Sequence, residues 1–144
     1  MFDLHNRVET ERVLSPAACG TTGTGRTGTV LDLQGYSGVE FIIDYGTFTA
    51  TDATVTITVL EGDATGSLTS VADSDLLGTE ALAGLAAQAT ARTSGTGKNV
   101  TKRVGYKGRK RYATVKEVPT VTAAGIIGVV GLLHSPGAMP TPNP

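Results

Sequence analysis

The segment Gly23–Gly28 has the sequence GTGRTG and matches the G-x-G-x-x-G pattern with which some enzymes hold a dinucleotide pyrophosphate. That chemistry needs a buried strand before the glycines and a helix after them, so that the helix N-terminus meets the phosphates. The preceding residues, SPAACGTT, contain no apolar strand pattern, and the following residues, TVLDLQGY, are typical of a strand. We therefore interpret the segment as a flexible Gly/Thr linker and predict no nucleotide cofactor.

The remaining residues that could support catalysis are few and dispersed. Cys19 is the single cysteine, which excludes an intrachain disulfide and a zinc site built from cysteines. The two histidines, His5 and His134, lie near the two ends of the chain, so we expect no Cys/His catalytic pair. The sequence SGTGKN at 94–99 lacks the P-loop form, because position 92 is Arg and position 99 is Asn. The sequence predicts no enzyme, no metal site and no cofactor.

The composition favours one β-rich domain. The chain has 144 residues, enough for a single hydrophobic core. It has 19 glycines, 17% charged residues and no tryptophan, and threonine is abundant, as in strand-and-turn proteins. The longest apolar run, Ile126–Leu133, is too short to span a bilayer, and residues 1–12 lack the apolar centre of a signal peptide. We predict no membrane partner.

The segments that would position any functional site have the sequence pattern of β-strands. In ATVTITVLE, Val55, Ile57 and Val59 alternate with threonines, which is typical of a half-buried strand. Turns rich in Gly and Asp separate further strand patterns, which we place at 29–33, 39–45, 68–71, 99–106, 111–118 and 120–134. The last of these has apolar residues on both faces and predicts a buried central strand. Thr79 can cap one short helix. We predict an all-β protein, an antiparallel β-sandwich or jelly roll.

We divide the chain into three parts. Residues 1–28 are expected to form an extended N-terminal arm with the Gly/Thr linker, because Pro16 ends any helix there and the apolar residues form no clean stripe. Residues 29–134 are expected to form the sandwich domain. Residues 135–144, SPGAMPTPNP, form a Pro-rich tail that cannot join the interior of a sheet.

Charge is strongly segregated along the chain. Residues 27–91 contain nine acidic and no basic residues, whereas residues 98–116 contain eight basic and no acidic residues. This pattern fits acidic and basic strands that pair within one sandwich, or a basic edge that meets an acidic face of a second copy. A third interpretation is nucleic-acid binding by the basic hairpin, where Tyr106 and Tyr112 could stack on bases. The sequence pI of about 6.1 gives no overall attraction to phosphate, so we predict no nucleic-acid partner.

Four segments together carry a resemblance to a known family: DLQGYSGVEFIIDYG, VTITVLEGD, VADSDLLG and RVGYKGRKRYATV. They resemble the cement, or decoration, proteins of tailed phages with HK97-type capsids, especially the Bordetella phage type. The resemblance spans residues 29–133, and its most specific element is Gly105–Gly108 followed by Lys110–Tyr112. It implies a jelly-roll-like β fold, no catalysis, and a homodimer on the outer surface of the capsid. Such a protein is made in the cytoplasm of the bacterial host.

We therefore expect a structural virion protein that stabilises the capsid by bridging subunits of the phage major capsid protein. Its expected contacts are apolar arm residues outside the core and four bases of a solvent-exposed turn, namely Phe2, Leu4, Val8, Val13, Leu14, Lys107, Arg109, Lys110 and Arg111. The alternative is an adhesion or carbohydrate-binding β-sandwich of a phage tail or spike. Sugar-binding sites commonly use exposed aromatic rings, and this chain has no Trp and four Tyr.

Overall fold

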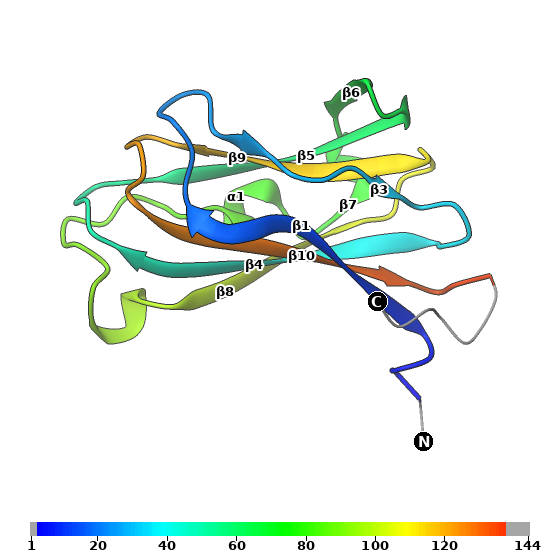
Figure 1. Ribbon diagram of the computed structural model, residues 1–144, viewed down its shortest axis with the longest axis horizontal. Helices are drawn as coiled ribbons and strands as arrows, with labels where there is room; N and C mark the ends of the chain where they lie inside the picture. Colours follow the sequence, from blue (N-terminus) through cyan, green and yellow to red (C-terminus); the bar gives the residue numbers. More distant parts are fainter. Residues whose placement is uncertain (1–2, 138–144) are drawn as a thin grey trace.

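The computed structural model describes residues 3–137, which form two stacked antiparallel β-sheets (Figure 1). The first sheet has the order β1 (Val8–Ala18), β10 (Gly125–His134), β4 (Gly38–Phe48), β8 (Val100–Tyr106) and β7 (Leu76–Leu77). The second has the order β2 (Arg26–Thr27), β9 (Tyr112–Pro119), β5 (Val55–Ala64) and β6 (Ser67–Ser70), and β3 (Leu31–Asp32) also pairs with β9. The predicted all-β sandwich is confirmed, and the jelly-roll assignment stays a prediction.

The core lies between the sheets, where the alternating strands place their apolar side chains. On β4, Val39, Phe41 and Ile43 are fully buried. From the facing sheet, Ile57 and Val59 on β5 fill the same layer. The alternation predicted for both strands is therefore confirmed, and it fixes which side chains remain on the outer faces.

Within residues 3–137, a single short helix, α1 (Glu80–Ala83), packs beside β5 and β8. It begins as predicted at Thr79, whose hydroxyl oxygen accepts a hydrogen bond from the Leu82 amide at 3.1 Å. It ends at Gly84, where a Cβ atom would lie 2.6 Å from the carbonyl oxygen of Val55. Close packing against β5 therefore requires glycine there. Two further 3-10 turns lie at Asp73–Asp75 and Gly95–Gly97.

Strand β1 corrects the expected N-terminal arm. It pairs with β10 from Val8 opposite His134 to the far end of both strands. Val13 and Leu14 are 3% and 6% exposed, so the expectation that they lie outside the core is wrong. Register shifts between Arg12 and Leu14 and again before Ala17 turn two consecutive residues inward. This irregularity hides the period of two by which a strand is recognised.

Strand β10 is central in its sheet, as predicted, but it is not buried on both faces. Ile127 and Val129 face the second sheet and are almost fully buried. Ile126 and Val130 face the other way and are 45% and 36% exposed. In Figure 1 the second sheet covers one side of this sheet, and none of the described elements covers the other. The apolar residues on that outer face remain accessible.

The GTGRTG segment forms an ordered turn rather than a flexible linker. The Gly25 amide donates to the Thr21 carbonyl at 2.8 Å, and the Gly23 amide donates to the Pro119 carbonyl at 3.2 Å. Gly23 and Gly25 have positive φ angles of 71° and 69°, which glycine adopts without strain. The turn leads into β2 and not into a helix. The geometry for binding a pyrophosphate at a helix N-terminus is therefore not formed by this segment.

Candidate functional site

Segments from four parts of the chain lie at the same end of the sandwich, the right-hand end in Figure 1. We call this the end surface, and it comprises residues 3–8, 33–37, 107–111 and 134–137. Tyr36 joins the segment 33–37 to β1, because its hydroxyl donates a hydrogen bond to the Glu9 carboxylate. Tyr36 also lines a hollow of about 510 Å³ together with Arg109 and Lys110. The two sets of contact residues predicted from the sequence therefore share one end of the molecule.

The basic turn at 107–111 is held rigidly. The ring of Tyr106 is fully buried beneath it, and a Cβ atom at Gly108 would lie 2.4 Å from that ring. The Tyr106 hydroxyl accepts from the Lys110 amide at 3.1 Å and donates to the Glu61 carboxylate at 2.5 Å. Burial, aided by Glu61, raises the pKa of Tyr106 well above its usual range, so the phenol stays a neutral donor. The turn is therefore preorganised.

Two of the four bases in this turn are paired within the molecule. Lys110 forms an ion pair with Asp63 at 2.5 Å. Arg111 contacts Asp32 through two hydrogen bonds of 3.0 and 2.7 Å, and this contact lowers the pKa of the Asp32 carboxyl. Pairing of acidic and basic segments within one sandwich therefore explains part of the charge segregation. All four bases are exposed at the turn, as expected, but Lys110 and Arg111 already have acidic partners within the molecule.

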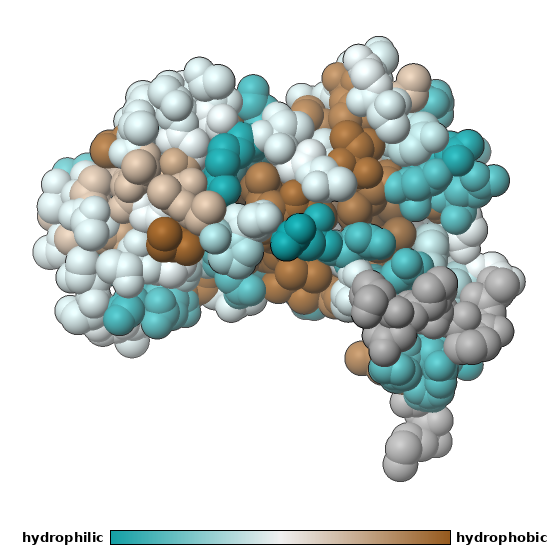
Figure 2. Space-filling model, viewed as in Figure 1, coloured by the Kyte–Doolittle hydropathy of each residue, from teal (hydrophilic) through white to brown (hydrophobic). Residues whose placement is uncertain are grey.

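The other predicted contact residues remain accessible on the end surface. Lys107 and Arg109 are exposed and make no ion pair within residues 3–137. Leu4 is 68% exposed and lines a second hollow with Val8 and His134. Figure 2 shows mainly hydrophilic surface at this end of the molecule. Phe2 lies outside the described residues, and Val13 and Leu14 belong to the core.

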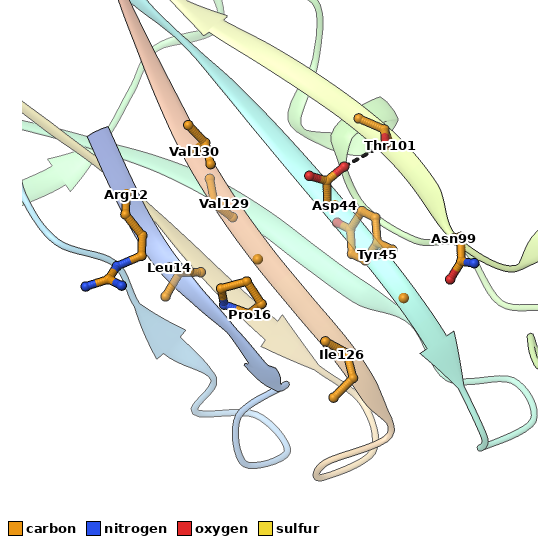
Figure 3. A pocket seen from close by; sticks show the side chains of 12 residues that line it. Arg12, Leu14, Pro16, Asp44, Tyr45, Asn99, Thr101, Ile126, Val129 and Val130 are labelled. Atoms are coloured by element: carbon orange, nitrogen blue, oxygen red, sulfur yellow. Dashed lines mark hydrogen bonds between the residues drawn. The ribbon is translucent and has the colours of Figure 1, made fainter. Parts of the chain in front are cut away.

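A separate groove of about 560 Å³ crosses the outer face of the first sheet. Figure 3 shows its walls: β1 with Arg12 on one side, and β4 and β8 with Asp44 and Thr101 on the other. Gly46 and Gly128 line it and contribute no side chain, which deepens it. We call it the outer-face groove. Its outward-facing apolar side chains are Pro16, Ile126 and Val130, whereas Leu14, Tyr45 and Val129, which also line it, are almost fully buried.

A buried ion pair closes the sandwich beside the GTGRTG turn. Glu117 is fully buried on β9, and its Oε1 accepts from Arg26 Nε and from the Gly20 amide, both at 2.8 Å. Arg26 also donates to the Ile127 carbonyl at 3.2 Å, which joins the two sheets. The Glu117 Oε2 atom has no hydrogen-bond partner in the described part of the chain. Sequence reasoning missed this pair, although Glu117 continues the inward positions of Ala113 and Val115.

The residues considered for catalysis are far apart. Cys19 is buried, and its amide bonds to the Gly125 carbonyl at the start of β10, whereas His134 ends the same strand. Within residues 3–137, no three His, Cys, Asp or Glu side chains gather in a way that could hold a metal ion. No helix in this range is long and apolar enough to cross a membrane.

Comparisons with known proteins give only distant likenesses. No family model matches the chain, and no curated protein matches its sequence. Among solved structures, the SPBc2 prophage-derived protein YomS has a TM-score of 0.48 at 11% identity, covering 89% of this chain and 93% of YomS. The xylan-binding module CBM15 has a TM-score of 0.38 at 14% identity, covering 95% and 96%. A Bacillus endospore appendage structure has a TM-score of 0.36 at 10% identity, covering 90% and 88%. Likenesses this distant carry no argument about function.

Proposed function

We propose that this protein is a structural component of a tailed-phage virion that binds the outer surface of the capsid. It stabilises the shell by bridging subunits of the major capsid protein, and it does so as a homodimer. It acts by binding capsid subunits, and this action involves no catalysis, no cofactor and no nucleic acid. The resemblance of residues 29–133 to capsid decoration proteins supports a phage capsid as the partner. The end surface supports the way in which the protein attaches to it.

The observation that carries the proposal is the presence of both predicted contact elements at the same end of the molecule. Leu4 and Val8 offer apolar area, and Lys107 and Arg109 offer two cations that are not neutralised by acids of the described chain. A surface of this kind fits a broad protein partner better than a small molecule. The rigid turn over Tyr106 presents its cations without a large ordering cost on binding.

The two parts of the end surface contribute differently to attachment. Complete burial of an apolar side chain such as Leu4, now 68% exposed, contributes about 1.5–3 kcal/mol before ordering costs. Lys107 and Arg109 act chiefly on the association rate and on the choice of an acidic partner surface. Their contribution weakens above about 0.1 M salt, where the Debye length is near 10 Å. Capsid binding should therefore keep a salt-insensitive part that depends on Leu4 and Val8.

Carbohydrate binding remains the alternative, and the surface favours it less. The large hydrophobic side chains exposed within residues 3–137 are aliphatic, with no aromatic ring among them. Tyr45, which lines the outer-face groove, is only 2% exposed, and its hydroxyl donates to the Ala83 carbonyl. A sugar ring that entered the groove would meet aliphatic side chains and would lack a stacking platform.

The test is binding to capsids of the phage or prophage that encodes this chain, prepared without the protein. One variant carries Leu4→Ser and Val8→Ser, and another carries Lys107→Ser and Arg109→Ser. Lys110 and Arg111 stay in place because they hold Asp63 and Asp32. A deletion of residues 2–14 is unsuitable because it removes core residues of β1. Both variants should bind at least about tenfold more weakly in a sedimentation assay, since each loses more than about 1.4 kcal/mol.

The matched control is Lys98→Ser with Arg92→Ser, which removes two cations away from the end surface. This control should bind like the parent. Unchanged binding of both end-surface variants, with folding verified by circular dichroism, contradicts this mode of attachment. Failure of the parent to bind any such capsid contradicts the proposed function itself.

A further inference from the structure

The outer face of the first sheet has apolar residues at its centre and charged residues at its edges. Cross-strand register places Arg12, Val130, Ile42 and Arg103 in one row across β1, β10, β4 and β8. The centre of the face is aliphatic, and Ile126 and Val130 are 45% and 36% exposed. A contiguous face of this kind is typical of a protein–protein contact.

The charges beside the outer-face groove are of opposite sign and lie on opposite walls. Arg12 is exposed on β1, and Asp44 is exposed on β4, where it accepts a hydrogen bond from Thr101 at 2.6 Å. Neither forms an ion pair within residues 3–137. In a two-fold symmetric contact, residue i of one copy meets residue j of the other, and j meets i. One cation and one anion across an apolar groove make this face complementary to itself.

The face also has about the area that such a contact needs. Four strands spaced about 4.8 Å apart, each contributing about eight residues at 3.4 Å, cover on the order of 500 Å² in projection. Specific interfaces begin near 600 Å² of accessible surface per partner, and side chains that stand out from a sheet raise its accessible area above the projection. Face-to-face packing of two sheets is a common solution for such surfaces.

We propose that two copies of this chain associate through the outer faces of their first sheets, with Arg12 of each copy paired to Asp44 of the other. Ile126 and Val130 of both copies are buried at the centre of this contact. The inference deepens the proposed function, on whose homodimer it rests, by assigning the dimer to a surface distinct from the end surface. The end surfaces of both copies remain available to the capsid.

The test is the dimer dissociation constant of the full chain, measured by analytical ultracentrifugation for the parent and three charge variants. Arg12→Asp and Asp44→Arg each place like charges in contact and should raise the dissociation constant at least about tenfold. The double variant with both changes restores opposite charges and should return it to within about threefold of the parent. Lys107→Asp, on the end surface, is the control and should leave it unchanged.

A milder variant, Ile126→Ser, tests the apolar centre without a new charge, and it should also weaken the dimer. Circular dichroism verifies the fold of each variant before it is compared. A parent that stays monomeric up to about 100 μM overturns the inference. A dimer that none of these variants weakens also overturns it. So does a double variant whose dimer dissociation constant is no lower than those of the two single charge variants. A monomeric parent whose capsid binding is lost with Ile126→Ser would assign this face to the shell, and it too would overturn the inference. Capsid binding of Lys107→Ser with Arg109→Ser is measured separately, so failure of the dimer and failure of capsid attachment are distinguishable.

Discussion

Replacing Arg26 with methionine removes the guanidinium that pairs with the buried Glu117 carboxylate. Glu117 is fully buried and Arg26 is 25% exposed, with 2.8 Å between the paired atoms. Loss of one partner from a buried pair leaves an uncompensated charge, at a cost of about 3–5 kcal/mol. Since water reaches part of Arg26, we expect the lower end, about 3 kcal/mol. A protein of this size then loses roughly 10 °C in melting temperature.

The assay is urea unfolding at neutral pH, followed by circular dichroism. Arg111→Met is the matched control, because it removes the pair with Asp32 in which both side chains are nearly half exposed. That change should cost at most about 1 kcal/mol. Combining Arg26→Met with Glu117→Leu removes the stranded charge and should recover most of the loss. If Arg26→Met costs no more than Arg111→Met, the reasoning about a buried charge is refuted.

Three further predictions concern other sites. Gly108→Val forces side-chain atoms against the Tyr106 ring, 2.4 Å from a Cβ atom, and should lower the free energy of unfolding by about 1–3 kcal/mol in urea titrations. Burial, with help from Glu9, raises the pKa of Tyr36 from 10.0 to about 12, so the folded state holds its proton longer than the unfolded state. Stability should therefore fall as pH rises from about 10 to 12, and phenolate absorbance should appear late; ionisation of every tyrosine near pH 10 in the folded protein would contradict this. Cys19 is 4% exposed and should react with a thiol reagent only after urea unfolds the chain, whereas rapid labelling of the native protein would show that it is accessible.

The sequence predicts well those strands whose side chains alternate strictly. Val55, Ile57 and Val59 face the core as expected, because one side of β5 meets the other sheet and the opposite side meets water. The same logic fails for β1, where a bulge places Val13 and Leu14 inward in succession. A bulge depends on the partner strand, which is not visible in the local pattern.

The surfaces were harder to predict than the strands. The basic turn at 107–111 was found from its residue types, but the pairing of Lys110 and Arg111 depends on Asp63 and Asp32, which are distant in sequence. The outer-face groove has no local sequence signal. An apolar strand such as β10 has the same sequence pattern whether both of its faces are buried or one of them is uncovered. Long-range contacts decide which applies.

The pairing of β1 with β10 has a consequence for the time course of folding. Val8 lies opposite His134, 126 residues later in the chain. At about 5–20 residues per second, the ribosome needs roughly 6–25 s after Val8 to reach the end of the strand that β1 requires. During that interval β1 and the β10-facing edge of β4 stay unpaired, and pairings of such long sequence separation are also slow to form. The first sheet is therefore completed only after synthesis of β10, so nascent chains that end before β10 should be the species most prone to aggregate.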